Sequence, residues 1–167
     1  MKKLGLDAST TTVGYAFVDG KEVIDLGFIP INKETTIRDK VQLTMDTITE
    51  LDPFGDIEQI YIEDSLSGFS RGRTSQQTII KLAKFNAVLT YCLEFAYGEI
   101  VEGVNPMTAR KHLFGKARVK GKTAKEFVKE EINSLYNLEE YVKLTKTGLW
   151  DKRNMDSYDA LVCALYE

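Results

Sequence analysis

Acidic residues stand at three separated places in the chain that folding can bring together. They are Asp7, Glu63, Asp156 and Asp159. A carboxylate that is buried beside an apolar strand without a partner is strongly destabilising, so it needs a neutralising group. Carboxylate oxygens without histidine or cysteine are typical ligands of Mg²⁺ or Mn²⁺ rather than of Zn²⁺. These acids therefore predict a site for hard divalent cations.

Asp7 follows the short apolar segment 4–6, which has the pattern of a buried strand, and precedes the polar turn 9–12. Its position is also compatible with an Asx-type turn, in which the Asp7 carboxylate hydrogen-bonds the backbone of that turn. A second alternating segment, around Val13, Tyr15 and Phe17, predicts the next strand. Asp7 alone does not distinguish a metal ligand from a turn residue.

The second acidic position is the pair Glu63-Asp64, at the end of the predicted strand 57–63. Side chains alternate along a strand, so Glu63 shares a face with Tyr61, and Asp64 shares the other face with Ile62. The alternation leaves open which face carries the site, or whether Glu63 is simply an exposed strand-end acid. If strands 4–6 and 57–63 are parallel neighbours, their ends lie about 5 Å apart.

The third acidic position is on the predicted last helix, where Asp156 and Asp159 are spaced i, i+3 and share one face. Asp156 is also compatible with a first-turn acid that interacts favourably with the helix dipole. Asp159 lies deeper in the helix and fits that reading less well. Carboxylates from three remote segments meet most readily at the carboxyl edge of a sheet, where a cation would relieve their repulsion.

Hydrophobic periodicity and turn residues predict an α/β domain. The chain order is β-β-β-α-β-α-β-α-α-α, with the first strand central in a mixed sheet and helices on both faces. Asp19-Gly20 predicts a hairpin turn, and Asn105-Pro106 predicts the start of a helix. The remaining predicted elements are strand 22–31, helix 34–51, strand 57–63, a long helix around 79–96, strand 100–104, helix 122–136 and helix 154–166.

Composition is ordinary for a globular protein, and 167 residues are enough for one domain, residues 1–167. Cys92 and Cys163 stand far apart in apolar patterns, so we expect two buried thiols in a reducing compartment. No run is long enough to span a membrane, and no apolar segment typical of a secretory signal follows the N-terminal lysines. We therefore expect a cytoplasmic protein without a membrane partner.

Positive charge is concentrated in residues 110–129, which carry a net charge of +7 in a chain whose total is −3. Such a concentration favours phosphate binding, although a solvated helix with a mobile loop is the simpler alternative. Within it we predict DNA contacts from Arg110, Lys111, Lys116, Arg118, Lys120, Lys122 and Lys125. We also predict DNA contacts from Arg71 and Arg73 in the predicted loop 65–74. His112 sits among lysines, so we expect it to be solvated or to face DNA rather than to act as a catalytic base.

The motif LGLDAST-x₃-GYAF, the later IYIED and the terminal MDSYDALVCAL together resemble the RuvC-type Holliday junction resolvases of the RNase H-like superfamily. The compact chain and its divergent loops resemble the phage-type RuvC-like endonucleases. The resemblance implies a five-stranded sheet in the order 3-2-1-4-5, a homodimer, and two Mg²⁺ or Mn²⁺ ions per subunit. It also implies metal-dependent cleavage of four-way DNA junctions. Asp7, Glu63, Asp156 and Asp159 become the catalytic metal ligands, and Phe69 becomes the candidate base-stacking aromatic.

Two other readings of the motifs remain. The first motif is shared with actin-like ATPases and sugar kinases, but those proteins need two such domains around a nucleotide, so we expect no nucleotide cofactor. A non-catalytic module that binds branched DNA and keeps a relic site is the other reading. The presence of all four acids in one chain argues against it.

Overall fold

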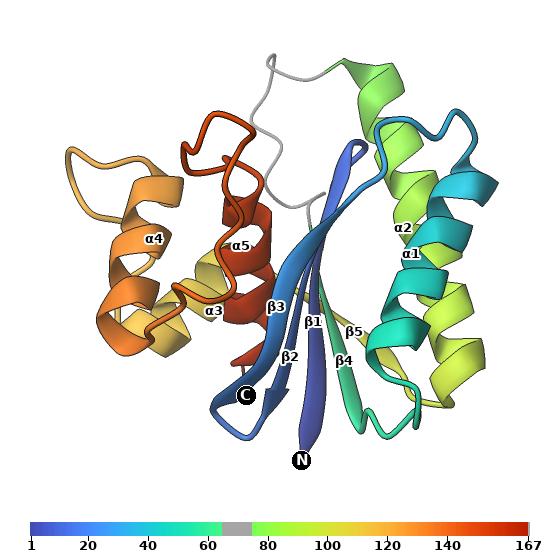
Figure 1. The fold of residues 1–167 in the computed structure, drawn as a ribbon, viewed down its shortest axis with the longest axis horizontal. Coiled ribbons are helices and arrows are strands. Elements are labelled where there is room, and N and C mark those ends of the chain that lie inside the picture. Colours follow the sequence, from blue (N-terminus) through green and yellow to red (C-terminus); the bar gives the residue numbers. More distant parts are fainter. Residues whose placement is uncertain (65–74, 167) are drawn as a thin grey trace.

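The computed structural model describes residues 1–64 and 75–166, which form a mixed five-stranded sheet with helices on both faces (Figure 1). The strands are β1 (Lys2–Ala8), β2 (Thr12–Asp19), β3 (Glu22–Pro30), β4 (Gln59–Glu63) and β5 (Val101–Val104). Their order across the sheet is β3-β2-β1-β4-β5, as predicted. β1 pairs antiparallel with β2 and parallel with β4, so it is central and its carboxyl end lies beside that of β4.

The helices of the described residues form two layers around the sheet. They are α1 (Ile37–Leu51), α2 (Gln76–Tyr97), α3 (Pro106–Phe114), α4 (Ala124–Leu135) and α5 (Asn154–Ala164). α1 and α2 cover one face, and α3, α4 and α5 lie on the other (Figure 1). Alternation along β1 and β4 divides the core accordingly: Leu4, Leu6 and Ile60 pack under α1 and α2, whereas Tyr61 packs on the side of α5.

Local signals in the sequence fix most of the element boundaries. Gly20 has a φ of 59°, a conformation that favours glycine, and it forms the predicted turn between β2 and β3. The Asn105 side chain accepts hydrogen bonds from two backbone N–H groups at the start of α3, and Pro106 follows it. α1 begins at Ile37 rather than at the predicted residue 34, because Thr36 caps it by accepting from the Asp39 N–H. The N-terminal prediction for that helix was therefore three residues too long.

α5 is buried along its length, and Asp156 is its one half-buried residue. One side of α5 rests on β1 and β2, while α3 and α4 cover another side. Two glycines permit the close approach to the sheet: a Cβ atom at Gly5 would lie 2.1 Å from the Ala160 carbonyl oxygen, and one at Gly14 would lie 2.0 Å from that of Asp156. The small residues of β1 and β2 thus seat the helix that carries two of the candidate acids.

Two further expectations concern the cysteines and the membrane. Cys163 is buried and Cys92 is half-buried, and both are free thiols. Across residues 1–64 and 75–166, the model contains no helix with the length and apolar character needed for a membrane span.

Candidate metal-binding active site

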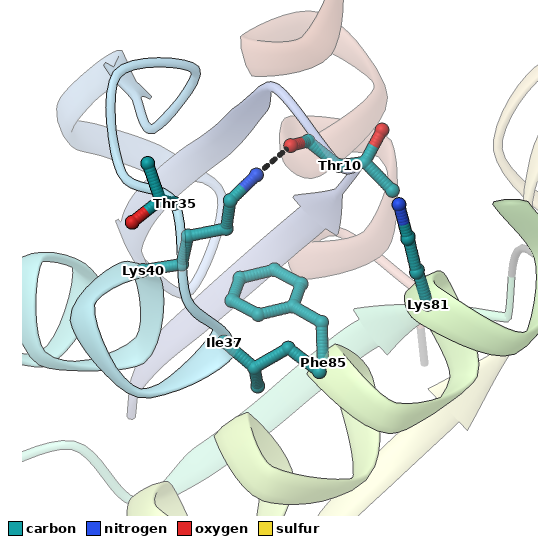
Figure 2. A pocket seen from close by; sticks show the side chains of 6 residues that line it. All are labelled: Thr10, Thr35, Ile37, Lys40, Lys81 and Phe85. Atoms are coloured by element: carbon teal, nitrogen blue, oxygen red, sulfur yellow. Dashed lines mark hydrogen bonds between the residues drawn. The ribbon is translucent and has the colours of Figure 1, made fainter.

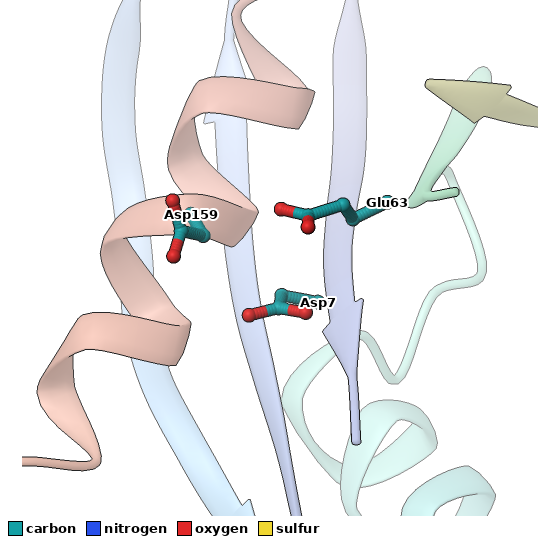
Figure 3. A group of neighbouring side chains, drawn as sticks. All are labelled: Asp7, Glu63 and Asp159. Atoms are coloured by element: carbon teal, nitrogen blue, oxygen red, sulfur yellow. The ribbon is translucent and has the colours of Figure 1, made fainter. Parts of the chain in front are cut away.

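Three of the predicted acids meet at the carboxyl edge of the sheet. Figure 3 shows Asp7 from β1, Glu63 from the end of β4 and Asp159 from α5 directed toward a common space. One carboxylate oxygen from each residue lies within 4.8 Å of those of the other two. Asp159 is buried, and Asp7 and Glu63 are half-buried. We refer to these three residues as the acidic trio.

The pairing of strands explains why these side chains meet. Gly5 faces α5, so Asp7, two residues further along β1, points to the same side. Glu63 shares its face with Tyr61, which also packs in the α5 layer. The structure thus places Glu63 rather than Asp64 in the trio, as the resemblance implied. The backbone N–H of Asp64 donates to the Val104 carbonyl at 2.8 Å and continues the edge of β5.

The turn after Asp7 is organised by Ser9. The Ser9 Oγ accepts from the Thr12 N–H at 3.0 Å and donates to the Thr12 carbonyl at 2.8 Å. It also accepts from the Thr11 N–H at 3.3 Å. Ser9 thus supplies the side-chain hydrogen bonds that the described residues show in this turn, while a carboxylate oxygen of Asp7 lies within 4.8 Å of those of Glu63 and Asp159.

Asp156 lies at the margin of the site and is not one of the trio. Its half-buried carboxylate is 3.5 Å from the Nζ of Lys125, an exposed residue at the start of α4. Lys125 was predicted to contact DNA, and in this structure it faces the acidic cluster. The pKa values of Asp7, Glu63, Asp156 and Asp159 are all raised, and the positive charge of Lys125 opposes the rise at each of them.

Arg110, which was predicted to contact DNA, lies inside the acidic site. Its guanidinium donates to Asp159 Oδ1 at 3.0 Å, and only 11% of the side chain is exposed. Its Nε is buried and has no acceptor among the residues that the structure describes. Arg110 therefore belongs to the acidic site rather than to an exposed phosphate-binding surface. The sequence did contain a signal: Arg110 lies three residues before the apolar Leu113, so the two share one side of α3. In the structure this is the inward side, next to buried Ala109.

Burial is the main cause of the unusual pKa values in this cluster. Desolvation raises the pKa of Asp7 well above its ordinary value, and repulsion from Glu63 and Asp159 adds to the rise. Desolvation and Asp159 raise the pKa of Glu63 to about 7, against the opposing effects of Arg110 and Lys125. Burial also raises the pKa of Asp159, which the Arg110 guanidinium partly offsets. Burial and mutual repulsion thus disfavour the charged form of these carboxylates, and a bound cation would favour it.

The residues of the trio fit a hard divalent cation. Each supplies carboxylate oxygens, and the site contains no histidine or thiolate ligand among the described residues. Mg²⁺ binds oxygen at 2.0–2.1 Å, so opposite ligands of one ion stand about 4 Å apart, which is compatible with oxygens that lie within 4.8 Å of one another. The raised pKa values indicate a surplus of negative charge that such an ion would neutralise. The chemistry of the donor set therefore suits Mg²⁺ or Mn²⁺.

The rest of the basic segment is exposed, but several of its charges are paired internally. Lys116 lies 3.1 Å from Glu131, and Lys122 pairs with Glu130. Arg118 and Lys122 line a pocket of about 280 Å³ with Val119, Thr123 and Ala124. Lys111 and Lys120 are exposed, and the His112 ring packs edge-on against Tyr166. Phe69, Arg71 and Arg73 lie outside the described residues.

Comparison with known proteins supports the resemblance. No family model matches the sequence. The curated crossover junction endodeoxyribonuclease RuvC of Aliarcobacter butzleri is 29% identical over 147 residues, which cover 86% of this chain and 88% of the relative. The RuvC of Campylobacter hominis is 27% identical over 124 residues, 71% of this chain and 73% of the relative.

Solved structures show the same fold at lower sequence identity. Thermus thermophilus RuvC superposes with a TM-score of 0.67 at 17% identity, covering 99% of this chain and 92% of the neighbour. The same protein in complex with a Holliday junction substrate gives 0.65 at 15% identity, covering 99% and 90%. The yeast mitochondrial Holliday junction resolvase Ydc2 gives 0.66 at 16% identity, covering 98% and 75%. The chain is thus similar in sequence to curated RuvC proteins, and it shares the fold of solved Holliday junction resolvases.

Proposed function

We propose that this protein is a metal-dependent DNA endonuclease that resolves four-way junctions by hydrolysing phosphodiester bonds. The observation that carries the proposal is the acidic trio, in which three segments remote in sequence bring carboxylate oxygens within 4.8 Å of one another. The curated relatives are named crossover junction endodeoxyribonucleases, and the T. thermophilus neighbour was solved with a Holliday junction. Both the site and the relatives support hydrolysis of branched DNA.

Asp7, Glu63 and Asp159 would hold the metal, with Asp156 as a fourth ligand once Lys125 moves aside. Two divalent ions, when bound, supply activation of a water and stabilisation of charge on the phosphate and leaving oxygen. The chain's own residues set the positions. Arg110 fixes the orientation of Asp159 through its 3.0 Å contact, and it limits the repulsion among the acids before metal binds.

Exposed lysines and arginines near the site would hold the DNA arms through phosphate contacts. Lys111 is exposed on α3, and Arg118 and Lys120 lie between α3 and α4. Lys116 and Lys122 can exchange their glutamate partners for phosphates. Phosphate contacts release counterions, so binding should weaken steeply with salt. They give affinity and orientation, while the paired active sites give selectivity for a branched substrate.

A homodimer would present two such sites to one junction. α2 carries four exposed apolar residues, Ile80, Val88, Tyr91 and Phe95. At 100° per residue they fall within an arc of about 80° on one side of the helix. The rings of Tyr91 and Phe95 stack at 6.4 Å, which gives this side a continuous apolar surface. A two-fold axis through such a surface would relate two sites, and symmetric cuts would follow.

A cleavage assay tests the proposal. The protein is incubated with labelled four-way, three-way and linear duplex DNA, in Mg²⁺ or in a chelator, and any cuts are mapped. We expect Mg²⁺-dependent, paired cuts placed symmetrically in the four-way junction and little cleavage of the linear duplex. Binding of the junction without cleavage in either Mg²⁺ or Mn²⁺ would contradict the proposal and favour a non-catalytic branched-DNA module.

A further inference from the structure

A second polar pocket lies at the same edge of the sheet as the acidic trio, but under the opposite helical layer. Figure 2 shows Lys40 from α1 and Lys81 from α2 extending toward Thr10, in the turn between β1 and β2. Thr35 stands at the rim, and Ile37 and the buried ring of Phe85 form the apolar wall. The pocket has a volume of about 210 Å³. Since liquid water takes about 30 Å³ per molecule, it has room for a phosphate group with several waters.

The two lysines bring like charges to one pocket without an acidic partner. Lys40 Nζ donates to the Thr10 carbonyl, which is a neutral acceptor. Within residues 1–64 and 75–166, neither ammonium has a carboxylate oxygen within 4.0 Å. An ammonium group has three donors. Among the residues that the structure describes, one donor of Lys40 contacts Thr10, and the side chain of Lys81 has no hydrogen-bond acceptor. The hydroxyl groups of Thr10 and Thr35 add neutral donors around the same space.

We propose that this pocket binds a phosphate of the DNA strand near the cleavage site, with Lys40 and Lys81 as its charged contacts. The proposal rests on the proposed nuclease function and adds a binding site on the side of β1 opposite the basic segment. A phosphodiester suits the pocket because its two non-bridging oxygens can accept from two ammonium groups, while the adjoining deoxyribose can pack on the apolar wall. The buried Phe85 ring is too enclosed to stack on a base.

The position of Thr10 ties the pocket to the active site. Thr10 is three residues after Asp7, so their Cα atoms are at most about 11 Å apart. A DNA strand rises about 3.4 Å per nucleotide, so the bound phosphate would lie within about three nucleotides of the scissile one. In the absence of metal, the acidic trio repels a phosphate, whereas the positively charged pocket attracts one. The pocket would therefore hold the strand in register before the metal-dependent step.

The test compares Lys81→Ala with Lys21→Ala, which removes an exposed lysine in the turn between β2 and β3, at the opposite end of the sheet from the pocket. Binding to a four-way junction is measured in Ca²⁺, as a function of salt, by fluorescence anisotropy. Losing one phosphate contact should reduce the log–log salt slope by about 0.7–0.9. We expect that reduction, with a severalfold weaker affinity, for Lys81→Ala, and unchanged values for Lys21→Ala. An unchanged slope in Lys81→Ala would overturn the proposal.

A second measurement locates the phosphate. Junctions that carry a single neutral methylphosphonate at successive positions around the cut are bound to wild-type protein and to Lys81→Ala. One position within about three nucleotides of the cut should weaken wild-type binding and have no further effect in Lys81→Ala, because both changes remove the same contact. Additive losses at every position would overturn the assignment to a DNA phosphate. So would specific competition by millimolar inorganic phosphate combined with an unchanged DNA slope, since the pocket would then be a site for free anions. Absence of cleavage in Mg²⁺ with the binding results intact would instead refute the nuclease function alone.

Discussion

Asp7 pairs with Gly14 across the β1–β2 ladder, and Gly14 is the position against which the backbone of α5 rests. A Cβ atom at Gly14 would lie 2.0 Å from the carbonyl oxygen of Asp156. The residue opposite the first acid thus sets how close the helix with the other acids can come. Sheet pairing and helix seating are therefore parts of the same active-site geometry.

Gly14→Ala is expected to displace α5 from the sheet and separate Asp159 from Asp7. Overpacking of this kind costs about 1–3 kcal/mol of stability. Misplacement of a catalytic group by about 1 Å can cost roughly a hundredfold in rate, so cleavage should fall more than stability suggests. Gly103→Ala in β5 is the matched control, since no atom lies within 4 Å of a Cβ there. Thermal unfolding and junction cleavage measure both variants; equal cleavage by Gly14→Ala and Gly103→Ala would contradict this account.

Glu63→Gln and Asp64→Asn distinguish the two neighbouring acids at the end of β4. Glu63 belongs to the trio, so its loss should abolish Mg²⁺-dependent cleavage while the fold is retained, because the amide keeps the shape and removes the charge. Asp64→Asn should be much milder, because its side chain is not in the trio and its backbone bond to Val104 is kept. Cleavage rates with circular dichroism as a fold control give the comparison. Complete loss in Asp64→Asn with activity retained in Glu63→Gln would reverse the assignment.

Arg110 and Lys111 are adjacent cations with different expected roles. Arg110→Gln removes the buried partner of Asp159 and should destabilise the metal-free protein by roughly 3 kcal/mol at pH 8. The loss should shrink as the pH falls, because burial raises the pKa of Asp159 and a proton can then neutralise it. It should reduce cleavage while leaving the salt slope of junction binding nearly unchanged. Lys111→Gln, at an exposed position, should lower that slope by up to about 0.9 and leave stability unaltered. Denaturant titrations and salt-dependent binding test the pair, and identical behaviour of the two variants would refute the distinction.

The metal-free protein should lose stability as pH rises from about 4.5 to 8. Burial raises the pKa of Glu63 from 4.5 to about 7, and that of Asp7 well above its usual range. The folded chain therefore binds more protons than the unfolded chain in this window, and the free energy of unfolding falls with rising pH. Mg²⁺ should raise the melting temperature more at pH 8 than at pH 5, because it replaces those protons. The free energy of unfolding is measured against pH for wild type and for Asp7→Asn, and the difference between the two curves gives the contribution of the trio. Identical curves would contradict this explanation.

Much of the fold follows from local signals in the sequence. The hairpin at Gly20, the proline that starts α3 and the alternation in β1 each determine their element without help from distant residues. Parallel pairing of β1 with β4 follows because a helical crossover joins them. The start of α1 was placed too early because Glu34 extends the helical pattern, whereas the Thr36 side chain provides the actual cap.

The site was less predictable where tertiary packing decides it. Alternation could not choose between Glu63 and Asp64, because the choice depends on which face of β4 receives α5. Arg110 was predicted as a DNA contact because it belongs to a positively charged segment. The sequence does not show that its side chain is buried against Asp159. The pocket around Lys40 and Lys81 joins residues 41 positions apart and has no motif. Such features depend on how helices sit on the sheet rather than on local sequence.

Binding of Mn²⁺ to wild type, Asp7→Asn and Asp64→Asn at pH 8, followed by calorimetry and by electron paramagnetic resonance, tests the central claim most directly. The proposed two-ion nuclease function predicts two Mn²⁺ per chain in wild type, proton release on binding, and unchanged stoichiometry in Asp64→Asn. Asp7→Asn should lose at least one ion, since it removes a ligand charge and keeps the shape. Wild-type number and affinity of Mn²⁺ in Asp7→Asn would show that Asp7, Glu63 and Asp159 are not the metal site.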